Sequence, residues 1–75
     1  MKLVLNLNSI EKVKRFCNEI NKFTDDFDLS CDHYIVDAKS IMGIFSLDLS
    51  RPVTLTSATA DKTAVELVLK DCILW

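Results

Sequence analysis

Apolar residues recur at two different spacings along this chain of 75 residues. Stretches in which every second residue is apolar predict strands with one buried face, and apolar residues three and four positions apart predict amphipathic helices. These patterns alternate in the order strand, helix, strand, strand, helix, strand, helix. The order predicts an α+β open-faced sandwich (βαββαβα), in which a four-stranded, mostly antiparallel sheet carries helices on one face.

Polar side chains mark where the predicted elements begin and turn. Ser9 and Ser40 precede two of the helices, and Thr59 or Asp61 precedes the last, where an oxygen can accept a backbone N–H group. Asp32 and His33 form a short turn between two strands, because Asp tolerates a positive φ. The predicted strands cover residues 2–7, 27–31, 34–38 and 53–57, and the first two helices cover 9–23 and 40 to about 47.

Two helices are long enough for a buried face to be assigned from spacing. The face of the first is expected to comprise Ile10, Val13, Phe16, Cys17, Ile20 and Phe23. That of the last is expected to comprise Ala64, Leu67, Val68 and Cys72, with Val65 and Leu69 flanking it.

The composition indicates one folded domain spanning residues 1–75, since 49% of the residues are hydrophobic and Gly and Pro occur once each. A net charge of -2 with interspersed signs argues against nucleic acid as a partner. No apolar run approaches the roughly 18 residues needed to cross a bilayer, so a cytoplasmic protein without a membrane partner is expected.

The three cysteines, Cys17, Cys31 and Cys72, are widely spaced and form no CxxC pair. We therefore expect neither a disulfide framework nor a zinc site, and predict no metal or cofactor. Cys17 and Cys72 lie on apolar helical stripes, where a thiol packs as a small hydrophobic group.

The segment 37–47 reads Asp-Ala-Lys-Ser-Ile-Met-Gly-Ile-Phe-Ser-Leu. It closely resembles the regulatory-serine region of HPr, the small phosphocarrier family of the bacterial sugar phosphotransferase system. In that family Lys-Ser-Ile-Met-Gly is followed by an apolar pair and Ser-Leu. The resemblance extends from about Phe23 through Leu55, and it implies the HPr fold and a role related to the phosphotransferase system.

The resemblance implies that Ser40 is a regulatory phosphorylation site for an HPr kinase-like enzyme. The alternative is that Ser40 only caps the helix. Lys39 could offset the added charge. Ile41 and Met42 are expected to form an apolar docking patch, to which Lys39 and Phe45 also contribute, whereas Ile44 and Leu47 are expected in the core.

The resemblance also implies that this chain lacks the histidine that carries phosphate in the family. The family carries phosphate on a histidine at the start of the first helix, within a Gly-Leu-His-Ala-Arg-Pro pattern. Here the stretch 7–13 contains no His, Arg or Pro. The histidine's place falls near Ser9 and the arginine's near Glu11, whose carboxylate would repel phosphate. His33, the one histidine of the chain, is expected to be an exposed turn residue.

These features favour a regulatory HPr-like protein that is not an enzyme, similar to the catabolite-repression paralogue that also lacks the histidine. Its expected partners are the kinase and a LacI-type transcription regulator or a metabolic protein. Two alternatives remain: an HPr-fold interaction module that is not phosphorylated, and a phosphocarrier that uses another residue.

Overall fold

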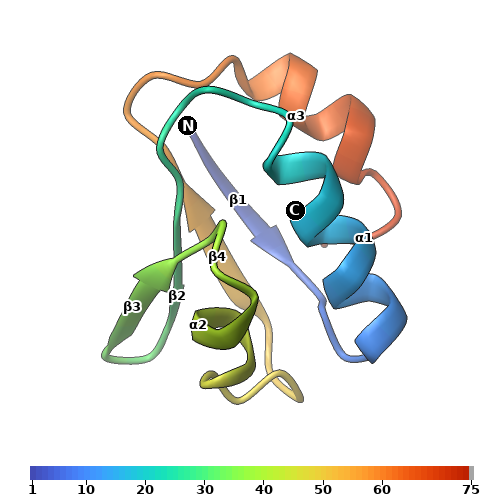
Figure 1. The fold of residues 1–75 in the computed structure, drawn as a ribbon, viewed down its shortest axis with the longest axis vertical. Coiled ribbons are helices and arrows are strands. Elements are labelled where there is room, and N and C mark those ends of the chain that lie inside the picture. The colour runs from blue at the N-terminus through green and yellow to red at the C-terminus, as the bar shows by residue number, and fades with distance from the viewer. Residues whose placement is uncertain (75) are drawn as a thin grey trace.

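The computed structural model describes residues 1–74 and contains the seven predicted elements in the predicted order (Figure 1). They are β1 (Lys2–Leu5), α1 (Ile10–Ile20), β2 (Asp28–Cys31), β3 (Tyr34–Asp37), α2 (Ile41–Phe45), β4 (Val53–Thr56) and α3 (Lys62–Leu69). Each strand is shorter than its predicted range, because the apolar alternation continues into residues that lie beyond the paired part of the sheet.

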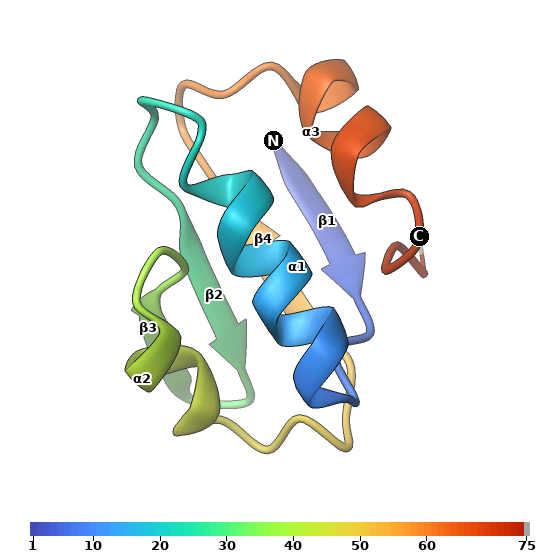
Figure 2. The same cartoon turned by 45° about the vertical axis from the view of Figure 1, so that its right-hand side comes forward.

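The strands form one sheet in the order β1-β4-β2-β3, and each pair is antiparallel. Helix α1 lies across the sheet between α2 and α3 (Figure 2). The predicted fold class is therefore confirmed. None of the helices within residues 1–74 is long and apolar enough to span a membrane.

The core lies between the sheet and the helices. Alternate strand residues point toward α1, and burying each large apolar side chain contributes roughly 1.5–3 kcal/mol. The fully or almost fully buried contributors from the strands and α1 are Leu3, Leu5, Leu29, Val53, Leu55, Val13, Phe16 and Ile20.

The predicted helix caps and the predicted turn between two strands are confirmed. The Ser9 hydroxyl oxygen accepts from the Lys12 N–H group at 3.1 Å, and Asp61 rather than Thr59 caps α3. Asp32 adopts a φ of 55° in the turn between β2 and β3. A small side chain that tolerates the left-handed region therefore allows this tight turn.

The predicted face of the first helix is correct in the middle and wrong at its start. Ile10 is 63% exposed, because it lies in the first turn of α1, ahead of the residues that contact the sheet. The helix ends at Ile20, and Phe23 lies beyond it, where its ring meets the Phe27 ring edge to face with centroids 5.7 Å apart. Cys17 is partly buried.

The predicted face of the last helix is wrong for Leu67 and Val68, whereas Cys72 is buried as predicted and Ala64 is half-buried. Val65 and Leu69 are buried, whereas Leu67 is 69% exposed and Val68 also faces solvent. The sequence offers two apolar stripes on this helix, and Cys72 is compatible with both. The stripe that contains Val65 and Leu69, four residues apart, is the one that is buried. Cys72 enters the core from the turn that follows α3.

Candidate functional site

Ser40 occupies the N-cap of α2, as predicted. Its hydroxyl oxygen accepts from the Gly43 N–H group at 3.2 Å, and its own N–H group donates to the Asp37 carbonyl at 3.0 Å. The side chain is exposed. The arrangement therefore stabilises a helix of only five residues and leaves the hydroxyl accessible from solvent.

Lys39, next to this serine, is directed elsewhere. Its ammonium donates to the Phe23 carbonyl at 2.6 Å and lies 5.9 Å from the centroid of the Phe27 ring. Its N–H group donates to the Asp37 carboxylate at 2.9 Å. The ammonium thus binds the chain just after α1, and this geometry gives no support to the expectation that it offsets charge at Ser40.

The residues of α2 divide between core and surface. Ile44 and Leu47 are buried, as predicted. Met42 is 78% exposed, Phe45 is 44% exposed and Ile41 is 38% exposed. One short helix therefore anchors itself through Ile44 and presents three large apolar side chains to solvent, which is unusual for a surface with no binding role.

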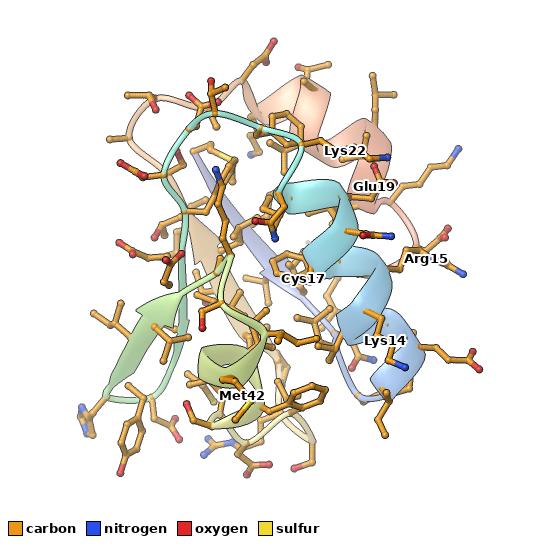
Figure 3. The ribbon with its side chains drawn as sticks, in the orientation of Figure 1. Lys14, Arg15, Cys17, Glu19, Lys22 and Met42 are labelled. Carbon is orange, nitrogen blue, oxygen red and sulfur yellow. The ribbon has the colours of Figure 1, made fainter. Side chains whose placement is uncertain are left out.

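A surface hollow of about 460 Å³ lies where α1 faces Ile41. Its other lining residues are Lys14, Cys17 and Asn18 on α1 and Asn21, the residue that caps the end of α1. Lys14 lies on α1 and Met42 lies on α2, the two helices that contribute residues to the lining of this hollow (Figure 3). The sequence prediction missed this stripe, although its positions are three and four residues apart and lie beside the buried stripe.

Side chains of α1 and of its C-cap residue also hold the start of α2 in place. The Asn21 amide donates to the Lys39 carbonyl at 3.4 Å and to the Cys17 carbonyl at 2.8 Å. The Cys17 thiol lies 3.8 Å from the same Lys39 carbonyl. The backbone that precedes Ser40 is therefore fixed from α1 rather than by α2 alone.

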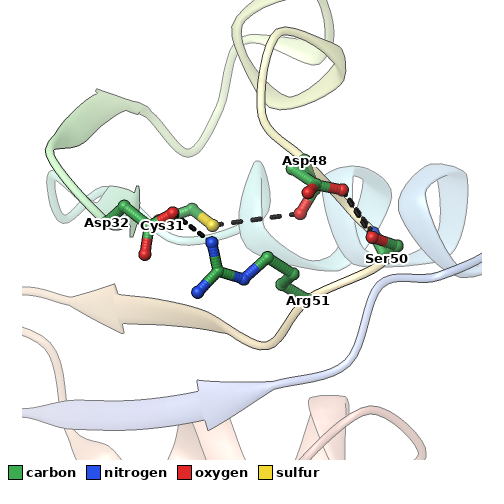
Figure 4. Close-up of polar contacts among 5 residues, drawn as sticks. All are labelled: Cys31, Asp32, Asp48, Ser50 and Arg51. Carbon is green, nitrogen blue, oxygen red and sulfur yellow. Dashed lines mark hydrogen bonds and ion pairs between the residues drawn. The ribbon is translucent and has the colours of Figure 1, made fainter.

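A polar cluster supports the loop between α2 and β4 (Figure 4). Both the hydroxyl and the N–H group of Ser50 donate to the Asp48 carboxylate, and these bonds hold the pKa of that exposed carboxyl below its usual value. Arg51 forms an ion pair with Asp32, which belongs to the turn after β2. The Cys31 thiol lies 3.9 Å from the Asp48 carbonyl.

The start of α1 carries the other pair of predicted site positions. Ser9 is the N-cap and Glu11 is an exposed acidic residue of the first turn. Both positions therefore lie at a helix N-terminus. His33 lies in the turn between β2 and β3 and is exposed, so it belongs to a different element from Ser9.

No protein-family model and no curated protein matches this sequence. Solved structures do match it. The structure of HPr-C-His from Thermoanaerobacter tengcongensis is similar with a TM-score of 0.77 and 26% identity, over 95% of this chain and 88% of that one. A histidine-containing phosphocarrier protein from Mycoplasma shares the fold, with a TM-score of 0.70, 13% identity, and coverage of 95% of this chain and 86% of that one.

The catabolite repression protein Crh from Bacillus subtilis is similar with a TM-score of 0.65. The match covers 89% of this chain and 84% of Crh, at 30% identity. Identity at this level over most of both chains shows that the chain belongs to the HPr family.

Proposed function

We propose that this protein is a regulatory member of the HPr family that accepts a phosphoryl group on Ser40 and docks partner proteins through α2. In this proposal it is a substrate and a binding partner, not an enzyme, and it acts in the cytoplasm, where its kinase would be found. The observation that carries the proposal is the exposed Ser40 hydroxyl at the start of a helix that also exposes Met42.

The chemistry of the site suits a phosphorylatable serine. The Ser40 oxygen already accepts a hydrogen bond from the Gly43 N–H group, and the start of a helix favours negative charge. The Asp37 carboxylate opposes an added phosphate, although it is engaged by the Lys39 N–H group. Lys39 would take part only if its ammonium left the Phe23 carbonyl.

The docking half of the proposal depends on Ile41, Met42 and Phe45. A flexible methionine side chain adapts to different partner surfaces, and two further apolar groups enlarge the contact. The proposed partners are an HPr kinase-like enzyme and a LacI-type transcription regulator or a metabolic protein. Lys39 is proposed to contribute to docking mainly by holding the start of α2.

The proposal assigns no phosphocarrier step to the start of α1. Ser9 stands at the cap position where an imidazole would be required, and a serine hydroxyl does not titrate near neutral pH as imidazole does. The Glu11 carboxylate in the first turn repels a phosphoryl group. His33 lies in a turn, without a helix N-terminus to stabilise phosphate.

The direct test is incubation with an HPr kinase and ATP, followed by mass spectrometry of the intact chain and its peptides. We expect one phosphoryl group on Ser40, and none in Ser40→Ala. Ser46→Ala is the matched control, because Ser46 is an exposed serine at the other end of α2. Absence of phosphate, or phosphate that persists in Ser40→Ala, would refute the regulatory proposal.

Two other functions give different results. An interaction module that is not phosphorylated would gain no mass, and its partner binding would depend on Met42 but not on Ser40. A phosphocarrier that uses another residue would accept label from the phosphoenolpyruvate-dependent enzyme of the phosphotransferase system. We expect no such label, either in the wild-type chain or in His33→Ala.

A further inference from the structure

The outer edge of β3 has no neighbouring strand or loop among residues 1–74, because β3 is the last strand of the sheet (Figure 1). The opposite edge of the sheet differs, since a bridge between Leu5 and Ile73 covers the outer side of β1. An edge strand presents a row of backbone N–H and carbonyl groups that can pair with another strand. The structure therefore leaves the β3 edge open for pairing.

The hydrogen bonds between β3 and β2 identify the backbone groups that point outward. The Ala38 N–H group donates to the Phe27 carbonyl at 3.0 Å. Bonding alternates along an antiparallel pair, so Ile35 and Asp37 direct their backbone groups away from β2. The Asp37 carbonyl accepts from the Ser40 N–H group at 3.0 Å. Within the described chain, the N–H and carbonyl groups of Ile35 and the N–H group of Asp37 have no hydrogen-bond partner.

The side chains of β3 offer apolar contacts on both faces of the sheet. Tyr34 is 72% exposed and Ile35 is 70% exposed. Val36 lies against Gly43 of α2, so Tyr34 shares the helix-covered side and Ile35 lies on the open face. Sheet edges are commonly protected from pairing by a lysine or a proline, and β3 contains neither. Nothing in this strand therefore opposes the addition of a further strand.

The open face beside this edge is acidic. Asp37 lies directly opposite Asp28 of β2, and like charges in that arrangement destabilise a sheet. One Asp37 oxygen accepts from the Lys39 N–H group at 2.9 Å. No ion pair of the described residues includes either carboxylate. A cation placed opposite Asp37 on an added strand is therefore attracted by two carboxylates that lack a charged partner.

We propose that the outer edge of β3 binds an extended segment of a partner protein that carries a Lys or Arg residue opposite Asp37 and an apolar residue opposite Ile35. The segment runs antiparallel to β3, as the paired strands within the sheet do. The basic residue precedes the apolar one by two positions, because residues two apart on a strand share a face. A further apolar or aromatic residue follows directly and lies opposite Tyr34.

Charge favours this occupant over a second copy of the chain. β3 contains Tyr, Ile, Val and Asp, so β3 of a second copy would bring a further carboxylate and no Lys or Arg to the edge. The binding mode is strand addition, in which backbone hydrogen bonds give affinity and alternate side chains give specificity. It is independent of phosphorylation at Ser40, because it uses a different element.

The probe is the peptide acetyl-Thr-Lys-Thr-Val-Tyr-Thr-amide, titrated into the isotope-labelled full chain and followed by nuclear magnetic resonance. In the proposed register its Lys lies opposite Asp37 and its Val lies opposite Ile35. We expect hydrogen exchange of these two protein amides to slow by at least about fivefold at saturating peptide, because both gain an acceptor. The Val36 amide is the internal control, since it points toward β2 in the free chain.

Two N-methylated peptides separate strand pairing from side-chain contact. Methylation of the Val nitrogen removes the N–H group that would donate to the Ile35 carbonyl. Methylation of the preceding Thr nitrogen is the matched control, because that N–H group points away from β3 in the proposed register. We expect the first peptide to bind at least about fivefold more weakly, and the second to stay within about twofold of the parent.

Substitutions test the charge and the apolar contact. A peptide with Glu in place of Lys should bind at least about threefold more weakly, and Asp37→Asn should reduce that difference. Ile35→Thr should weaken binding of the parent peptide. Leu67→Thr is its matched control, because Leu67 is exposed to a similar extent on α3, and it should leave the affinity unchanged. Far-ultraviolet circular dichroism checks that each variant is folded.

Several results would overturn the proposal. These are an absence of binding, bound peptide with unchanged exchange at Ile35 and Asp37, equal affinities of the two methylated peptides, and equal affinities of the Lys and Glu peptides. Shift changes confined to α2 would place the peptide on the surface formed by Ile41, Met42 and Phe45 instead. A homodimer in sedimentation velocity that protects the Ile35 amide without peptide would assign the edge to a second copy.

Discussion

The ammonium group of Lys39 donates a hydrogen bond to the backbone carbonyl of Phe23, 2.6 Å away. This contact joins the loop before α2 to the chain just after α1. The same ammonium group lies above the Phe27 ring. The residue next to the candidate regulatory serine is therefore a structural link between two helices. Its charge is used to hold the site in place.

Substitution of Lys39 by Met is expected to lower the free energy of unfolding by no more than about 3 kcal/mol, because a hydrogen bond from a charged donor is lost. The part-buried Phe23 carbonyl would be left without this donor. Lys14→Met is the control, since Lys14 is exposed on α1 and a surface substitution there should change stability by no more than about 0.5 kcal/mol. Urea unfolding measures both. Equal effects of the two substitutions would contradict the structural role of Lys39.

The cap of α2 gives a second prediction. Ser40→Ala removes the oxygen that accepts the Gly43 N–H group, and should lower the free energy of unfolding by about 1 kcal/mol. Ser40→Asp supplies a carboxylate oxygen at the same position and should recover most of that loss. Thermal unfolding of the three proteins measures the difference. If Ser40→Asp is as unstable as Ser40→Ala, the hydroxyl oxygen is not acting as a cap.

The order of elements and the caps were predictable because they depend on local chemistry. Alternation in β1, the serine before α2 and the Asp at the β2–β3 turn each act over a few residues. The resemblance through segment 37–47 also identified the family correctly. Ser40 and Met42 were predicted to be accessible, and both are exposed in the structure.

The remaining features depend on tertiary packing. The direction of the Lys39 ammonium follows from where the chain after α1 places the Phe23 carbonyl, which no local pattern encodes. The hollow beside Ile41 forms only because α2 packs next to α1. The bridge between Leu5 and Ile73 joins distant parts of the chain and had no signal in the apolar spacing.

The face of α3 shows how two apolar stripes compete. Val65→Ala is expected to lower the free energy of unfolding by about 2 kcal/mol, since it removes buried methyl groups and leaves a cavity. Leu67→Ala removes a larger side chain but should change stability by no more than about 0.5 kcal/mol, because that residue is exposed. Denaturant titration of the pair decides which stripe is buried. A larger effect at Leu67 would restore the face that the sequence spacing suggested.

The Cys72 thiol gives stability a pH dependence of known sign. Burial raises the pKa of this thiol above its usual value, and the nearby Asp71 carboxylate adds to the shift, whereas Lys12 and Arg15 oppose it. Below the pKa of the unfolded thiol, about 8.5, both states hold the proton and the group gives no pH dependence. As the pH rises above that value, the unfolded chain loses the proton first, so the free energy of unfolding decreases.

We therefore expect the free energy of unfolding of the wild-type chain to fall more steeply between pH 7 and about 9.5 than that of Cys72→Ala, which lacks the titrating group. Cys17→Ala is the control, because it removes a partly buried thiol from α1 and leaves Cys72 in place. It should keep the steeper wild-type dependence. Urea unfolding under reducing conditions at several pH values provides the measurement, and identical slopes for the wild-type chain and Cys72→Ala would show that Cys72 is not the group responsible.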